Sequence, residues 1–171
     1  DHVYAINNGR RYDIVNIEDP ANPKRVGRFE LDTPGHSVHD VWIEDGIAYS
    51  SNWSDGLQLV DIGGATAGAP FRKFGEQPNP EIRSPFNAGG SPSNPVQFAG
   101  YSDPRGWNHA AFPFHSESTK KFYVLAGDET FPNGLGVRES KPSVADGWIH
   151  FVDFTDLKNP QETANYRVPE A

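Results

Sequence analysis

Histidine and carboxylate side chains are the residues of this chain best suited to chemistry, because cysteine is absent. Without cysteine there are no disulfides, no thiolate metal sites and no cysteine nucleophile. Two of the six histidines, His39 and His109, begin the similar segments His-Asp-Val-Trp-Ile and His-Ala-Ala-Phe-Pro. Imidazole is a good ligand for Zn, Cu, Fe or Ni. If the fold brings these two imidazoles together, they predict a metal site. The alternative is that each one stabilises a turn through a hydrogen bond to the backbone.

Further candidate ligands lie near these histidines. Asp128 and Glu129 close an expected strand, and an acidic pair beside a histidine would complete a ligand set or supply a general base. The alternative for this pair is a solvated turn. His36 precedes His39 by three residues, so the two face opposite sides of a strand, and joint ligation requires a bend at Gly35.

Three aromatic residues are candidates for contact with a partner protein. Phe86, Phe98 and Tyr101 lie in the proline-rich segment 78–104, which we expect to contain neither strand nor helix. Exposed aromatic residues on a proline-stiffened loop suit contact with a partner or a cap over a channel. The alternative is that they pin the loop to the adjacent sheet.

Composition restricts the class of protein. A net charge of −8 and the absence of a basic stripe oppose binding to phosphate backbones, so we expect no nucleic-acid partner. There is no apolar run of the length that spans a membrane. Aromatic residues make up 12% of the 171 residues, which argues against disorder, while 17 glycines and 15 prolines indicate many turns and few helices.

The elements that must position these side chains are short β-strands. Residues 38–44, 47–53 and 57–62 are rich in β-branched and aromatic side chains. Asp45-Gly46 separates the first two as a hairpin turn, and Ser54-Asp55-Gly56 separates the last two. We therefore expect an antiparallel meander around which the rest of the chain is organised.

This meander is repeated along the chain. Asp13-Ile-Val-Asn-Ile and His150-Phe-Val-Asp-Phe align without gaps, and the middle copy places Val60 at the position of Val15 and Val152. Val15 and Val60 are 45 residues apart, a spacing typical of one four-stranded propeller blade. The larger spacings elsewhere agree once 78–104 and 130–146 are treated as insertions.

The repeat predicts an all-β fold, a β-propeller fragment of about two and three-quarter four-stranded blades. Blade one covers 1–34 and lacks its inner strand, blade two covers 35–77, and blade three covers 105–168. The predicted strands are 2–7, 12–17 and 25–31; 38–44, 47–53, 57–62 and 71–74; and 108–114, 122–126, 148–154 and 163–168. Closed propellers need four to eight blades, so we expect the remaining blades to come from the same parent or from another chain.

The repeated segments resemble a known family. Leu-Gln-Leu-Val-Asp, Tyr-Asp-Ile-Val-Asn and Ile-His-Phe-Val-Asp are similar to the repeat named for its consensus, LVIVD, and the likeness covers nearly the whole chain apart from the two insertions. The resemblance implies a β-propeller of a kind commonly exported in bacteria, without a single established activity. It therefore implies a periplasmic or extracellular location.

Three functions remain open from the sequence. The first is a propeller that acts as a binding or assembly module, with a divalent metal ion (Zn, Cu, Fe or Ca) at the central channel. The second is an enzyme, a metal-dependent hydrolase or oxidoreductase that uses His39, His109 and Glu129. The third is a structural subunit held in a larger assembly. Calcium would bind at Asp-Pro turns, although the spacing of an EF-hand is absent.

Overall fold

The computed structural model describes residues 1–7, 9–63, 88–102, 107–128 and 148–167. All regular structure within these ranges is β, arranged as three antiparallel sheets without a helix. The expectation of an all-β fold is therefore confirmed for the part of the chain that the structure describes.

Each sheet is a meander whose strands are neighbours in the order of the chain. Sheet 1 consists of β1 (His2–Ile6), β2 (Arg11–Asn16) and β3 (Lys24–Glu30). Sheet 2 consists of β4 (Asp40–Glu44), β5 (Ile47–Ser51), β6 (Leu57–Asp61) and β7 (Val96–Tyr101). Sheet 3 consists of β8 (Asn108–His115), β9 (Phe122–Asp128), β10 (Trp148–Asp153) and β11 (Gln161–Arg167).

One strand lies where the sequence predicts only loop. Val96–Tyr101 forms β7 and pairs with β6, so the expectation that 78–104 contains no strand is wrong for these six residues. This strand contains no proline, and it lies at the edge of its sheet, where it pairs on one side only. The strand predicted at 71–74 and the insertion at 130–146 lie outside the described residues.

The tight turns follow from the residues that occupy them. Asp45 and Gly46 both have positive φ, 48° and 76°, which is the requirement of the two-residue hairpin turn that matches strand twist. Gly56 has φ 70°, and a β-carbon at this position would collide with the backbone carbonyl of Tyr101. Glycine at this turn therefore permits the close approach of the end of β7.

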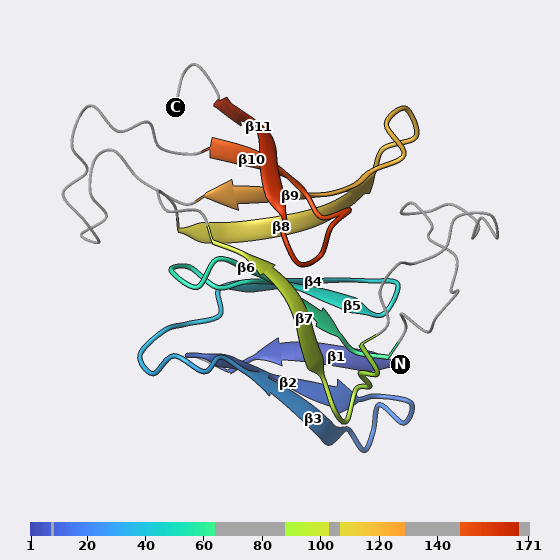
Figure 1. Ribbon diagram of the computed structural model, residues 1–171. Coiled ribbons are helices and arrows are strands. Elements are labelled where there is room, and N and C mark those ends of the chain that lie inside the picture. The colour runs from blue at the N-terminus through green and yellow to red at the C-terminus, as the bar shows by residue number, and fades with distance from the viewer. Residues whose placement is uncertain (8, 64–87, 103–106, 129–147, 168–171) are drawn as a thin grey trace.

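The three sheets stack face to face, with sheet 2 between the other two (Figure 1). We call the face of each sheet that is directed toward the next sheet in chain order its upper face, and the opposite face its lower face. Both faces of sheet 2 are covered, and every residue of β5 is therefore buried.

Two apolar cores fill the spaces between the sheets. The core between sheets 1 and 2 consists of Tyr12, Ile14, Phe29, Leu31, Val38, Ala48, Val60 and Ile62. The core between sheets 2 and 3 consists of Ile47, Tyr49, Leu57, Leu59, Ala99, Ala111, Phe122, Val124, Ala126, Val152 and Phe154. Because side chains alternate along a strand, Leu59 and Val60 enter different cores.

Candidate functional site

The two histidines singled out by the repeat lie against each other. The ring centroids of His39 and His109 are 4.3 Å apart, and both side chains are half-buried. His39 directly precedes β4, where its backbone N–H donates to the carbonyl of Ser51 at 2.7 Å. His109 is the second residue of β8. The starts of the first strands of sheets 2 and 3 are therefore adjacent, as the repeat predicts.

Two tryptophans complete this group, which we call the imidazole–indole cluster (His39, Trp53, Trp107 and His109). The ring centroids of Trp53 lie 4.3 Å from His39, 5.3 Å from Trp107 and 6.4 Å from His109. Reciprocal backbone hydrogen bonds between Trp53 and Asn108 fix the spacing of the two sheets here. The indoles cover part of the imidazole surface, so the histidines meet in a partly dry environment.

The other predicted ligands do not join this cluster. His36 pairs instead with Asp55, with its Nδ1 2.7 Å from a carboxylate oxygen. Asp128 pairs with His150 in the interior of sheet 3, and Glu129 lies outside the described residues. Within the described ranges, no group of three or more histidine or acidic side chains has the arrangement of a metal site. The cluster therefore offers two imidazoles as metal ligands.

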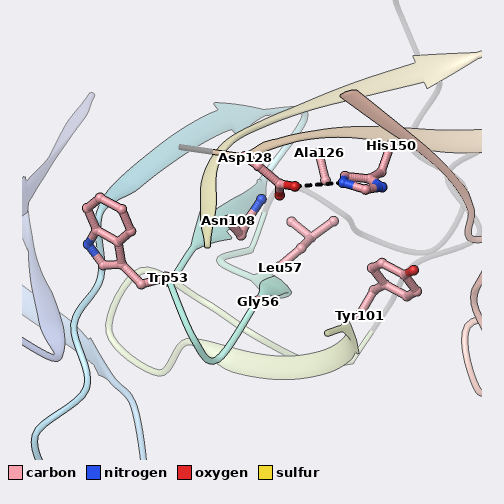
Figure 2. A pocket seen from close by; sticks show the side chains of 8 residues that line it. All are labelled: Trp53, Gly56, Leu57, Tyr101, Asn108, Ala126, Asp128 and His150. Atoms are coloured by element: carbon pink, nitrogen blue, oxygen red, sulfur yellow. Dashed lines mark hydrogen bonds and ion pairs between the residues drawn. The ribbon is translucent and has the colours of Figure 1, made fainter. Parts of the chain in front are cut away.

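The most extensive polar group in the described interior is centred on His150, which sequence reasoning treats as an ordinary sheet residue. Its Nε2 lies 2.8 Å from a carboxylate oxygen of Asp128, and its Nδ1 lies 3.3 Å from Glu162. The side chains of His150 and Asp128 are 1% and 5% exposed. Figure 2 shows these two side chains directed toward each other across neighbouring strands.

Sheet 2 contributes to this network through Tyr101. The Tyr101 hydroxyl donates to Glu162 at 3.0 Å, and the side-chain amide of Asn165 donates to the other carboxylate oxygen at 2.7 Å. Burial by itself raises the pKa of Glu162, but hydrogen bonds from Asn165, Tyr101 and His150, together with the charge of His150, lower this pKa to about 2. The network thus joins the last strand of sheet 2 to the last strand of sheet 3.

This geometry favours a structural role for His150 over a catalytic one. An imidazole donates to two carboxylates at once only when both ring nitrogens carry protons. A ring bonded in this way offers no lone pair to a metal ion or to a proton in transfer. A charge-bearing pair that is buried and bonded on both sides instead fixes the register of the elements that carry it.

A small cavity adjoins the network and the imidazole–indole cluster (Figure 2). It measures about 10 Å³, which is about the space needed by one water molecule. Trp53, Tyr101, Asn108 and His150 line it among other residues. The side-chain oxygen of Asn108 is buried without a hydrogen-bond partner, so a single water is the occupant that this space and chemistry suit.

The predicted partner-binding aromatics are packed rather than displayed, where the structure describes them. Phe98 and Tyr101 are half-buried on β7 and pack against the core between sheets 2 and 3. Phe86 lies outside the described residues. These positions correspond to the alternative in which the aromatics hold the segment against the sheet.

Comparison with known proteins leaves the chain without a relative: no protein-family model, curated protein or solved structure matches it. Among the residues that the structure describes, no helix is long and apolar enough to cross a membrane.

Proposed function

We propose that the three sheets are successive blades of a β-propeller, and that the chain acts as a binding and assembly module with a divalent metal ion at the hub. Three like meanders stacked face to face support the blade arrangement, as does the likeness of the repeats to LVIVD. Closed propellers contain four to eight blades, so three sheets amount to part of one.

The observation that carries the binding function is the pairing of His39 with His109. These two residues occupy the same position in successive sheets, and their ring centroids are 4.3 Å apart. In a propeller the first strands of all blades surround the central axis. A pair of imidazoles that opens on this axis would be reached by ions and small molecules entering the channel.

The donor set defines the kind of ion. Two imidazoles suit Zn, Cu or Ni, whereas Ca prefers a cage of oxygen ligands. Two protein ligands leave further coordination positions for water or for a donor group of an incoming molecule. We therefore propose an open site that captures a transition-metal ion together with an external ligand.

Metal titration of the purified chain tests this function. Equilibrium dialysis with Zn, Cu or Ni should give one ion per chain, and His39→Ala and His109→Ala should each reduce the affinity at least tenfold. His115→Ala is the matched control, because His115 ends β8 and lies at the other end of the strand from His109. Equal binding by all three variants would refute the hub site.

The same proposal includes an extracytoplasmic location, supported by the likeness of the repeats to a family that is commonly exported. Fractionation of the source cells with an antibody against this chain would test it. Recovery of the protein only with cytoplasmic markers would contradict it.

A further inference from the structure

The two outer faces of the stack have the same composition as the faces that pack together inside it. We infer that copies of the chain associate head to tail, with the upper face of sheet 3 in one copy packed on the lower face of sheet 1 in a second copy. This inference rests on the blade arrangement of the proposed function, but it is independent of the metal at the hub.

The upper face of every sheet carries large apolar side chains at equivalent positions of the strand pairing. These positions are Tyr4, Tyr49 and Leu125; Ile14, Leu59 and Phe151; Tyr12, Leu57 and Ile149; and Phe29, Tyr101 and Tyr166. In sheets 1 and 2 the next sheet covers them, so Tyr12 and Leu57 are 0% and 1% exposed. Their equivalent in sheet 3, Ile149, is 37% exposed, and Tyr166 is 54% exposed.

The rest of the upper face of sheet 3 is also apolar. Phe112 and Phe114 on β8 are 45% and 48% exposed, and they lie on the face of their strand opposite to the buried Ala111. A soluble chain rarely leaves so many large apolar side chains together at its surface unless they meet a partner. The composition of this face is that of a blade interface.

The lower face of every sheet carries small side chains at the facing positions. These are Val3, Ala48 and Val124; Ala5, Ser50 and Ala126; and Val15, Val60 and Val152. Ala48 and Val124 are fully buried beneath the large residues of the preceding sheet, whereas Val3 on sheet 1 is 46% exposed. Large side chains of one sheet against small side chains of the next is therefore the packing rule of both observed interfaces, and one face of each kind is unoccupied by the described residues.

A polar group on sheet 1 matches the group that Tyr101 contacts inside the molecule. Asp13 occupies the position of His150, and Asn7 occupies the position of Asp128. The side-chain amide of Asn7 donates to Asp13 at 3.0 Å, just as Asp128 and His150 pair in sheet 3.

The tyrosine that would meet this group in a second copy is Tyr166, which is the equivalent of Tyr101. Tyr101 donates its hydroxyl to an acidic side chain of sheet 3. In a head-to-tail contact, the Tyr166 hydroxyl would donate to the carboxylate of Asp13 in the second copy. The outer faces therefore match in polarity as well as in size.

The area of these faces indicates how the copies assemble. Strands lie about 4.8 Å apart and rise about 3.3 Å per residue, so a face of three or four strands covers about 300–400 Å². A single contact buries two such faces, about 600–800 Å² in total, which is small for a stable interface. A closed ring in which each copy makes two contacts doubles the buried area for a pair, to about 1,200–1,600 Å². We therefore expect closed rings, since a heterologous contact closes when its rotation allows.

Sedimentation velocity of the full chain in EDTA tests the association without any metal-mediated contribution. Over about 1–500 μM, we expect the wild-type mass to rise to a dimer or larger closed ring. Ile149→Lys and Val3→Lys should each raise the dissociation constant at least tenfold, because each buries an unpaired ammonium group. Ile6→Lys is the matched control, since Ile6 is 40% exposed and lies on neither outer face.

A crosslinking experiment keeps the inference testable if a lysine variant folds poorly. The chain has no cysteine, so Ile149→Cys and Val3→Cys can be prepared separately, mixed and oxidised. The expected product contains one copy of each variant. Crosslinks within Ile149→Cys alone would show that the sheet 3 faces pair with each other, and would overturn the head-to-tail contact. A wild-type chain that remains monomeric at all concentrations, even if it binds metal at the hub, would overturn the association while leaving the hub site intact.

Discussion

The sharpest prediction concerns the acid sensitivity that Glu162 gives to the contact between sheets 2 and 3. Because its pKa is lowered from the ordinary 4.5 to about 2 in the folded state, Glu162 stabilises the fold above about pH 4.5. That stabilisation is lost as the pH falls from 4.5 through 2, since the unfolded state takes up the proton first. Glu162→Gln removes this group from the titration.

The size of the effect follows from the fall in pKa. At 1.36 kcal/mol for each pKa unit, a fall from 4.5 to about 2 corresponds to about 3 kcal/mol as an upper limit. The side chain is 20% exposed, so solvent screening reduces this value. We expect Glu162→Gln to lower the free energy of unfolding at pH 7 by about 1–2 kcal/mol, in the range of hydrogen bonds to charged groups.

Urea denaturation followed by tryptophan fluorescence, repeated between pH 2 and pH 7, measures this effect. Wild-type stability should fall more steeply than that of Glu162→Gln between pH 4.5 and pH 2, so that the two curves converge at low pH. Tyr101→Phe should reproduce part of the loss at pH 7, because it removes one of the hydrogen bonds that hold the charged carboxylate.

Two exposed residues provide matched controls. Glu18→Gln should leave both the stability and its pH dependence unchanged, and Tyr166→Phe should leave the monomer equally stable, because both side chains are exposed. If Glu162→Gln and wild type fall in parallel between pH 4.5 and pH 2, the network does not hold Glu162 ionised and the reasoning is wrong.

Three further changes test the packing. Gly56→Ala should lower the free energy of unfolding by more than 2 kcal/mol, because the added carbon collides with the backbone of Tyr101; Gly35→Ala, also at positive φ but in open space, should cost about 1 kcal/mol, and equal losses in the two melts would contradict this. Asn52→Ala should cost about 2–4 kcal/mol by urea denaturation, because fully buried Asn52 makes three hydrogen bonds to its turn; a loss below 1 kcal/mol would contradict it. Leu59→Ala should cost about 2–5 kcal/mol by calorimetry, since the side chain is fully buried between sheets 2 and 3, and a smaller loss would indicate that the core collapses around the cavity.

The meander and its repetition could be predicted from sequence because both rest on local signals. The turn residues Asp45 and Gly46 mark a hairpin by their tolerance of positive φ, and the valines at 15, 60 and 152 recur in register. β7 could not be predicted in the same way. Prolines on both sides of it suggest a loop, and its partner strand β6 is more than thirty residues earlier in the chain.

The candidate site divides along the same line. The pairing of His39 with His109 follows from the repeat, because equivalent positions in adjacent sheets are neighbours in space. The partners of His150 carry no local signal, because Asp128 and Glu162 lie 22 and 12 residues away and only the strand register aligns them. The polar residue between apolar neighbours in Ile-His-Phe-Val is the one sequence feature that marks the position.

That polar position links the repeat to the energetics of the whole stack. It is occupied by Asp13, Gln58 and His150 on the lower faces of the three sheets, so every interface between sheets must accommodate a polar group. His150 is satisfied by two carboxylates, and one of these is bonded to Tyr101 of the sheet below. The side-chain oxygen of Gln58 is buried toward sheet 1 without a hydrogen-bond partner, which costs about 1–3 kcal/mol. The interface between sheets 1 and 2 is therefore the weaker of the two. If the stack opens locally, it should open there, leaving sheets 2 and 3 joined around the paired imidazoles.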